Sequence, residues 1–420
     1  MPSKRWDCLK AVIKMNKLEQ LINELCPNGV EYRRLENCCE ILDNKRKPVT
    51  KSAREAGKYP YYGANGIQDY VSNYIFDGTF ILVGEDGSVV TEIGTPIVTW
   101  ATGKIWVNNH AHIISEINGV LLRYLFHYLQ TVPVKHLIHG NIPKLTGGDF
   151  KALKIAVPPL PVQEEIVRIL DKFTELTAEL TAELTARQKQ YSFYRDYLLD
   201  FADEDITKKI PDIDCSNVEY KKLGDIADIT RGGKFQKKDF VEQGKPCIHY
   251  GQIYTRLGIT TQEPITYLNN DVYNKSKKAV PKDIVMAVTS ENVEDVCKCT
   301  VWVGNEDIAV SGHTAIIHPI INSKFLAYYF QTTMFFKQKR KFAHGTKVIE
   351  VTPDKLNNII IPVPPISVQE NIVKILDRFD KLNNDISEGL PAEIETRRKQ
   401  YEYYRDKLLT FKKKEIAENE

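Results

Sequence analysis

One stretch of the sequence contains the residue types of a metal-dependent nuclease. Residues 211–221 read PDIDCSNVEYK, which places Pro-Asp ahead of a Glu-x-Lys pair formed by Glu219 and Lys221. In such enzymes carboxylates hold a divalent ion and a lysine steadies the attacking hydroxide. A related stretch that begins at Cys26, CPNGVEYRR, has no aspartate pair upstream. Because the pattern recurs without those carboxylates, we interpret it as a structural strand shared by two halves of the chain.

Other signatures of catalysis and of cofactor binding are missing. The stretch TRGGKF has neither the GxxxxGK nor the GxGxxG spacing of a phosphate-binding loop. Both Pro-Pro pairs are followed by an aliphatic residue, not by the aromatic residue of an amino-methyltransferase motif. The 8 cysteines show no CxxC spacing, so we expect reduced thiols, no metal site and no catalytic residue. Four histidines in strand-like apolar runs are interpreted as partly buried: His110, His112, His313 and His318.

Length and composition predict a cytoplasmic protein of two globular parts. The chain has 420 residues, of which 42% are hydrophobic and 27% charged, and it is too long for one ordinary core. No stretch approaches the roughly 20 apolar residues that span a bilayer, and the N-terminus lacks the apolar centre of a secretory signal. The net charge of +2 neither favours nor excludes nucleic-acid binding, so the local distribution of charge must be used to judge it.

Basic and polar side chains concentrate on loops of both globular parts, mixing phosphate donors with groups that read base edges. The stretch 43–66 supplies Lys45, Arg46, Lys47, Lys58, Tyr61, Tyr62 and Asn65. The stretches TRGGKFQKKDF and YGQIYTRLG supply Arg231, Lys234, Gln236, Lys237, Lys238, Gln252, Tyr254 and Arg256. Two His-Gly loops, IHGNIPK and AHGTK, add His139, Asn141, Lys144, His344, Thr346 and Lys347 as second-choice contacts. One such run is usually a solvated loop, but two at like positions favour binding.

The elements that position these loops occur twice. VPPLPVQEEIVRILDKF at 157–173 matches VPPISVQENIVKILDRF at 363–379 in 12 of 17 positions. RQKQYSFYRDYLLDF at 187–201 matches RRKQYEYYRDKLLTF at 397–411 in 10 of 15 positions. We call these segments the first and second blocks of each copy. The matches indicate an internal pseudo-twofold duplication.

Each copy ends in a predicted long helix, at 157–201 and at 363–411. Its apolar residues recur at steps of three, four or seven, which makes one continuous stripe. Such a stripe needs a partner, so we predict that the helices pair as an antiparallel coiled coil. Pro391 is expected to kink or interrupt the second helix. The predicted interface comprises Ile166, Ile169, Phe173, Leu176, Leu180, Leu184, Tyr191, Tyr194, Leu198, Ile372, Ile375, Phe379, Leu382, Ile386, Tyr401, Tyr404 and Leu408.

Short β-branched runs between turn residues precede each helix and are predicted as strands: FILVGEDGSVV, TPIVTWATGKIWV, DIVMAVTS and TAIIHPII. They predict an α+β fold with two mixed α/β domains at 26–156 and 216–362. A leader and helix are expected at 1–25, a linker at 202–215 and a charged tail at 412–420. MNKLEQLINEL places Leu18, Leu21, Ile22 and Leu25 on one face, so Met15 is the more natural start.

Two dissimilar domains, each followed by a VPP-x-x-x-Q helix, together with the units in TELTAELTAELTA at 174–186, resemble the specificity subunit of type I restriction-modification systems. The resemblance covers about 15–411. It implies that each domain reads one half of a split, asymmetric site in double-stranded DNA, with the helices as spacer. It also implies a non-catalytic chain that seats two methyltransferase subunits and joins restriction subunits in phage defence. S-adenosylmethionine is then expected on the methyltransferase, ATP and Mg on the restriction subunit, and no cofactor on this chain.

Two other classes use the same residues differently. A stand-alone DNA-binding regulator with two modules would bind DNA tightly without a methyltransferase, whereas a specificity subunit would co-purify with one. A protein scaffold would bind its partner without sensitivity to DNA or to salt.

Overall fold

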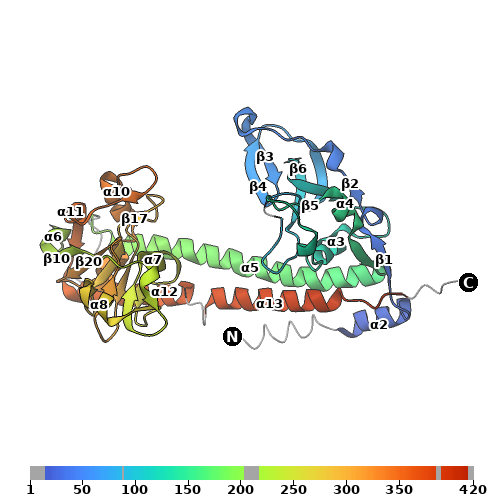
Figure 1. Ribbon diagram of the computed structural model, residues 1–420. Coiled ribbons are helices and arrows are strands. Elements are labelled where there is room, and N and C mark those ends of the chain that lie inside the picture. Colours follow the sequence, from blue (N-terminus) through green and yellow to red (C-terminus); the bar gives the residue numbers. More distant parts are fainter. Residues whose placement is uncertain (1–14, 88, 203–216, 385–388, 415–420) are drawn as a thin grey trace, which may run out of the picture. The chain divides into compact units, whose positions relative to one another are not determined.

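The computed structural model describes residues 15–87, 89–202, 217–384 and 389–414, which form two compact units (Figure 1). Unit 1 consists of the residues up to Glu179 and those from Ile394 onward, and unit 2 of Leu180–Glu393. The proposed leader up to residue 14 and nearly all of the proposed linker lie outside the described residues. Among the residues that are described, no helix is long and apolar enough to cross a membrane.

Unit 1 is built on a six-stranded sheet with the order β2-β7-β5-β6-β3-β4. The predicted strands in FILVGEDGSVV and TPIVTWATGKIWV are confirmed as β5 and β6, which pair antiparallel from Phe76↔Ile105 to Val83↔Val98. β1 pairs with β8 and so brings the two ends of the domain together. The elements are α2 (Met15–Leu25), β1 (Glu31–Arg34), β2 (Glu40–Ile41), β3 (Ala56–Gly63), β4 (Gly66–Val71), β5 (Phe76–Gly84), β6 (Val98–Val107), β7 (Ala111–Ser115), α3 (Leu122–Leu129), α4 (Gly147–Ala152) and β8 (Lys154–Val157).

Unit 2 contains two five-stranded sheets with the orders β10-β20-β16-β18-β13 and β11-β14-β12-β19-β15. Its strands are β9 (Glu219–Lys222), β10 (Ala227–Arg231), β11 (Phe240–Val241), β12 (Lys245–Ile248), β13 (Thr260–Thr261), β14 (Thr266–Leu268), β15 (Lys278–Ala279), β16 (Ile284–Ala287), β17 (Thr289–Ser290), β18 (Cys299–Trp302), β19 (Ile308–Val310), β20 (Thr314–Pro319), β21 (Ile349–Glu350) and β22 (Ile360–Val363). Its helices include α6 (Leu223–Ile226), α7 (Tyr250–Thr255), α8 (Asn270–Lys275), α9 (Ser323–Tyr329), α10 (Thr333–Phe342) and α11 (Pro353–Leu356).

Four strands follow the same scheme in both units. In unit 1 the order β2-β7-β5-β6 is antiparallel throughout, and in unit 2 the order β10-β20-β16-β18 is antiparallel as well. β9 pairs with β22 as β1 pairs with β8. The sequences between these strands differ in length and content, so a common framework carries different loops.

The long helices begin where the sequence predicts. α5 (Leu160–Leu199) follows the first VPP triplet, and α12 (Ile366–Asn384) follows the second. The helix predicted over 363–411 is interrupted, as expected from Pro391: α12 ends at Asn384, and α13 (Leu390–Leu408) is a separate helix with Pro391 as its second residue. Proline is tolerated there because the first N–H groups of a helix have no intrahelical acceptor. Ile386 and the side chain of Leu382 lie outside the described residues.

Each first block is fixed to the domain that precedes it by a buried glutamine. The Oε1 atom of Gln163 accepts a hydrogen bond from the backbone N–H of Leu121 at 2.9 Å, and its Nε2 donates to the carbonyl of Pro158. Gln369 does the same with Asn322 and Pro364. These bonds satisfy the backbone N–H groups of the residues that cap α3 and α9. Each glutamine therefore couples its long helix to the domain that precedes it.

A carboxylate in each first block makes a second attachment. Asp171 accepts hydrogen bonds from Arg123 at 2.7 Å and lies 2.9 Å from a ring nitrogen of His127. In unit 2 Asp377 accepts from Lys324 and Tyr328 at 2.8 and 2.7 Å. Burial lowers the pKa of His127 more than the neighbouring Asp171 raises it.

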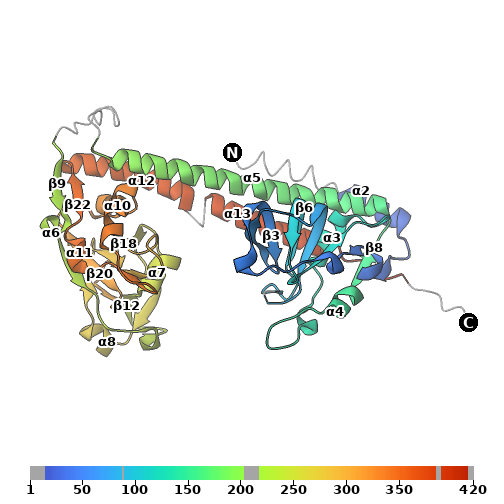
Figure 2. The ribbon, with the colours of Figure 1, turned by 90° about the horizontal axis from the view of Figure 1, so that it is seen from above.

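Each second block packs against the other copy's domain, which the sequence did not predict. In unit 1 the α13 residue Tyr401 places its hydroxyl 2.9 Å from His127, and the carbonyl of Phe411 accepts from Tyr32. In unit 2 the α5 residue Asp196 accepts from the first backbone N–H of α10, that of Thr333, at 3.2 Å. The two views of the ribbon show α13 beside α5 in unit 1 (Figures 1 and 2).

The predicted helix interface divides between two roles. Ile166, Ile169 and Ile372 are fully buried in the domain cores, so the stripe faces its own domain at the start of each helix. Further along, Phe173 stacks on Tyr404 in unit 1 at 5.3 Å between ring centroids, and Phe379 stacks on Tyr194 in unit 2 at 5.7 Å. The others are buried (Leu180, Tyr191, Leu198, Leu408) or half-buried (Leu176, Leu184, Ile375, Tyr401).

Candidate nucleic-acid interface

One predicted basic loop of each unit lies at one edge of its sheet. In unit 1 the pairs Ile41↔Ile114 and Gly84↔Ala111 place the ends of β2 and β5 beside the beginning of β7. In unit 2 the pairs Arg231↔Ala315 and Ala287↔Thr314 place the ends of β10 and β16 beside the beginning of β20. The runs that begin at Asp43 and at Arg231 therefore occupy corresponding positions.

Arg46 holds the loops of unit 1 together. Its guanidinium donates to the Glu85 carboxylate at 2.6 Å and to the carbonyls of Ala111 and Asp43 at 2.7 and 2.9 Å. The side chain is only 12% exposed. A guanidinium used in this way positions three loops, and the contact of Arg46 with DNA stays a prediction.

His112 completes this network. Its Nδ1 lies 2.6 Å from the Asp43 carboxylate, its Nε2 lies 3.1 Å from the carbonyl of Leu145, and its ring stacks on Phe150. Burial alone would raise the pKa of Asp43, but the hydrogen bonds and charges of His112 and Arg46 hold it below its usual range. Asp43, Glu85 and His112 have ligand atoms close enough for one metal ion. Both imidazole nitrogens of His112 instead contact oxygen acceptors, and the Glu85 carboxylate accepts from Arg46.

Unit 2 uses Arg231 in a similar way. Its Nε donates to the carbonyl of Gly312 at 3.1 Å and its Nη2 to the Glu350 carboxylate at 2.8 Å, which joins the start of β20 to the second His-Gly loop. Arg231 remains exposed, but its guanidinium already has a carboxylate partner. The three lysines that follow, Lys234, Lys237 and Lys238, are exposed and form no ion pair within the described part of the chain.

Four predicted contacts belong to the interior instead. Tyr61 is 1% exposed and its hydroxyl bonds to the backbone of Val49, and Tyr62 lies in a core cluster. The amide of Gln252 bonds to Thr266 and to the backbone of His249, while the hydroxyl of Tyr254 donates to the carbonyl of Thr289 at 2.7 Å. Aromatic and amide groups with these partners stabilise the domain, and their contact with DNA stays a prediction.

The remaining predicted contacts are exposed and stay predictions. They are Lys45, Lys47, Lys58, Asn65, His139, Asn141, Lys144, Lys234, Gln236, Lys237, Lys238, Arg256, His344, Thr346 and Lys347. Lys144 also forms an ion pair with Glu85 at 3.2 Å.

Three of the four histidines that were expected to be partly buried were misjudged from sequence. Only His112 is buried; His110, His313 and His318 are exposed. His110 bonds to Asp86, and His313 lies 3.1 Å from the Thr289 hydroxyl. Each histidine directly precedes a strand, β7 or β20, and contacts the segment that follows the neighbouring strand, β5 or β16. The matching segments NNH and SGH were the signal that could have identified the pair.

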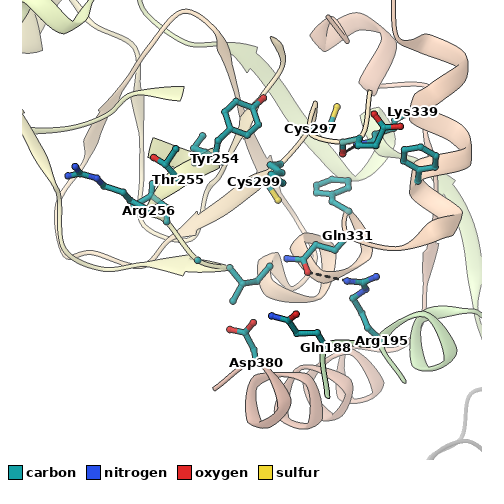
Figure 3. A pocket seen from close by; sticks show the side chains of 18 of the residues that line it. Gln188, Arg195, Tyr254, Thr255, Arg256, Cys297, Cys299, Gln331, Lys339 and Asp380 are labelled. Atoms are coloured by element: carbon teal, nitrogen blue, oxygen red, sulfur yellow. Dashed lines mark hydrogen bonds between the residues drawn. The ribbon is translucent and has the colours of Figure 1, made fainter. Parts of the chain in front are cut away.

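Unit 2 contains a cavity of about 790 Å³ between α7, α10, α5 and α12 (Figure 3). Arg256 lines it, and Arg195 of α5 donates to Gln331 there at 3.5 Å. Lys339 is buried in its wall, and its Nζ donates to the carbonyls of Glu294 and Val296. Burial lowers the pKa of Lys339.

The nuclease-like residues have a structural role. Glu219 and Lys221 lie on β9 and form an ion pair with each other at 2.6 Å, as Glu31 and Arg33 do on β1 at 2.7 Å. The interpretation as a strand shared by both copies is confirmed for the described residues. The upstream aspartates lie outside them.

The network around Arg46 predicts a large stability effect. We expect Arg46→Ala to lower the free energy of unfolding of unit 1 by about 2–3 kcal/mol, because Glu85 and Asp43 lose a partly buried cation. Lys45→Ala, an exposed neighbour, should change it by less than about 0.5 kcal/mol. Urea unfolding followed by hydrogen exchange in β5 and β7 measures both. Equal effects of the two substitutions would show that Arg46 is not a clamp.

The fold and these loops define a protein with two recognition domains attached to shared helices. Residues 27–187 and 215–396 each match the family model of the type I restriction modification DNA specificity domain. The chain belongs to this family.

Relatives support this assignment over most of the chain. A type I restriction enzyme specificity subunit of Haemophilus influenzae is 34% identical over 405 residues, which cover 91% of this chain and 96% of the relative. The Escherichia coli EcoR124I/EcoR124II specificity subunit is 36% identical over 322 residues, 72% of this chain and 74% of that protein. The crystal structure of the S subunit of M. genitalium has a TM-score of 0.52 at 15% identity, covers 91% of this chain and 96% of its own, and shows the same fold.

Proposed function

We propose that this chain is the DNA-recognition subunit of a type I restriction-modification enzyme and reads a bipartite, asymmetric site with one half-site per unit. The observation that carries the proposal is the double match to a DNA specificity domain, on units that share a framework and present different loops at the same edge. A shared framework with different loops suits one task performed on two different sequences.

The helices supply the second part of the proposal. The reciprocal contacts Phe173 with Tyr404 and Phe379 with Tyr194 support an internal duplication in which the two helical segments pair antiparallel. On this basis α5 and the α12–α13 pair form the spacer between the two half-site readers. They also offer repeated surfaces on which two methyltransferase subunits dock, with restriction subunits joining the complex.

The chemistry then belongs to the partners. Adenine methylation would use S-adenosylmethionine on the methyltransferase subunits, and translocation and cleavage would use ATP and Mg on the restriction subunits. This chain would bind and orient the DNA. Co-expression with the methyltransferase subunit, followed by sequencing of methylated adenines, tests the proposal: a split motif that depends on this chain supports it. Specific DNA binding by this chain without assembly with a methyltransferase would favour the alternative function, a stand-alone DNA-binding regulator.

The exposed lysines after β10 should act on phosphates. Replacing Lys234, Lys237 or Lys238 by Gln is expected to weaken binding to all DNA sequences and to reduce the salt slope, the dependence of log K on log salt, by roughly 1 per contact. Lys222→Gln, on the strand β9 away from this edge, is the control and should leave the slope unchanged. Fluorescence anisotropy at several salt concentrations measures the slope. A changed base preference would assign the lysine to base reading.

A further inference from the structure

Each unit exposes one branched aliphatic side chain at the tip of its His-Gly loop. Ile142 is 69% exposed and Val348 is 58% exposed, although the residues directly before them, Asn141 and Lys347, are polar and basic. Neither side chain belongs to a core cluster of the described residues.

The two side chains occupy the same position in the fold. In unit 1 the N–H of Leu145 donates to the carbonyl of Glu85 at 2.8 Å, and the N–H of Gly87 donates to the carbonyl of Pro143. Ile142 directly precedes this paired segment.

The corresponding segment of unit 2 has the same register. The N–H of Val351 donates to the carbonyl of Val288 at 3.0 Å, and Ser290 pairs with Ile349. Val348 directly precedes that segment, so it is the structural counterpart of Ile142.

The backbone of both loops forms a narrow ribbon. His139 is bridged to Lys144, and His344 is bridged to Glu350. Gly345 has a φ of 112°, and a Cβ there would lie 2.0 Å from the carbonyl oxygen of Val348, so only glycine permits this turn. Gly140 has a φ of 91° at the equivalent place.

An aliphatic tip that is shared by otherwise different loops favours a shared ligand. The second loop is one residue longer and its polar residues differ, yet the aliphatic tip is kept. Both tips lie on the sheet edge that carries the exposed lysines, and Lys347 directly precedes Val348. The major groove of DNA admits a two-stranded ribbon, and its apolar feature is the thymine methyl group.

We infer that Ile142 and Val348 enter the major groove and pack on a thymine methyl group, one in each half-site. This inference rests on the proposed function. It adds a reader that recognises thymine by shape and apolar contact, beside the polar and basic contacts predicted above. A half-site that holds a target adenine always contains at least one thymine, opposite that adenine.

Replacing each thymine of the half-sites in turn by deoxyuridine removes only the methyl group. With the assembled methyltransferase complex, one such replacement per half-site should weaken binding about fourfold, the value of one buried methyl group. Ile142→Ala should weaken binding by at least about fourfold and abolish the effect of deoxyuridine in one half-site only. Val348→Ala should do the same for the other half-site.

Ile320→Ala is the matched control, because Ile320 is 78% exposed but follows the opposite end of β20. It should leave both affinity and the deoxyuridine effect unchanged. Two results would overturn the inference: losses of affinity from Ile142→Ala and from deoxyuridine that add independently, or no loss of affinity from Ile142→Ala. Specific binding by the unaltered complex would still uphold the proposed function in either case. Failure of the unaltered complex to prefer its own site would instead reject the proposed function.

Discussion

Exchanging residues 26–157 for the first recognition domain of a relative is expected to change one half-site completely and to leave the other unchanged. The domain is closed at its base by the pairing of β1 with β8, so both junctions of the exchange fall beside one two-stranded sheet. Its loops and the loops of unit 2 belong to different compact units.

The attachment to α5 sets the design of this exchange. Gln163 bonds only to backbone groups: those of residues 119 and 121, which an incoming domain can supply, and that of residue 158, which stays with α5. Asp171 needs the side chains of Arg123 and His127, so the graft must keep both residues. A matched graft with alanine at position 123 should fold less stably yet specify the same bases.

Sequencing methylated adenines in cells that carry the chimera measures the result. A change in both half-sites would contradict the two-module proposal. A chimera that keeps both original half-sites would show that the exchanged domain does not read bases.

Inserting one TAEL unit after Leu184 is expected to lengthen the unread spacer of the target by one base pair without changing either half-site. α5 is continuous over Leu160–Leu199 and contributes to both units. Four added residues extend a helix by about 6 Å and rotate it by about 400°, a net turn of about 40°. B-DNA turns by about 34° and rises about 3.4 Å per base pair.

The expectation of one base pair follows from the rotation of the helix and not from its rise, because both units must face the groove of the DNA. A net turn of about 40° nearly matches one base pair, and slight bending of the DNA absorbs the remaining 2–3 Å or so of rise. The repeated leucines keep their face, because Leu176, Leu180 and Leu184 recur at steps of four and are buried or half-buried.

A three-residue insertion is the control. It rotates the following helix by about 300° and swings the stripe off its partner, so we expect loss of specific methylation. Sequencing of methylated sites distinguishes the outcomes. An unchanged spacer after the four-residue insertion, or altered half-site bases, would reject the role of α5 as a ruler.

Most of the secondary structure was readable from local pattern. The steps of three and four predicted α5 and the start of α12 to within a few residues, and the β-branched runs predicted β5, β6, β16 and β20, because helical and extended backbones bury residues with different periods. The repeated blocks also predicted two domains, whose ends coincide closely with β1 and β8 and with β9 and β22.

The candidate interface was predicted only in part, because side-chain roles depend on partners that lie far away in the sequence. Lys45 and Arg46 look equivalent in the sequence, yet Arg46 meets Glu85 from another loop and is withdrawn from solvent. Tyr61 and His110 were misjudged in opposite directions for the same reason, one being buried and the other 47% exposed.

The sequence by itself determined the repeated frame, the helices with their four-residue units, and the family to which the resemblance pointed. The tertiary structure decided which domain each second block contacts, and it brought Ile142 and Val348 to equivalent positions. The physical reason is that periodicity is a local property of the chain. Pairing register, burial and the choice of ion-pair partners arise only when segments separated by tens or hundreds of residues pack together.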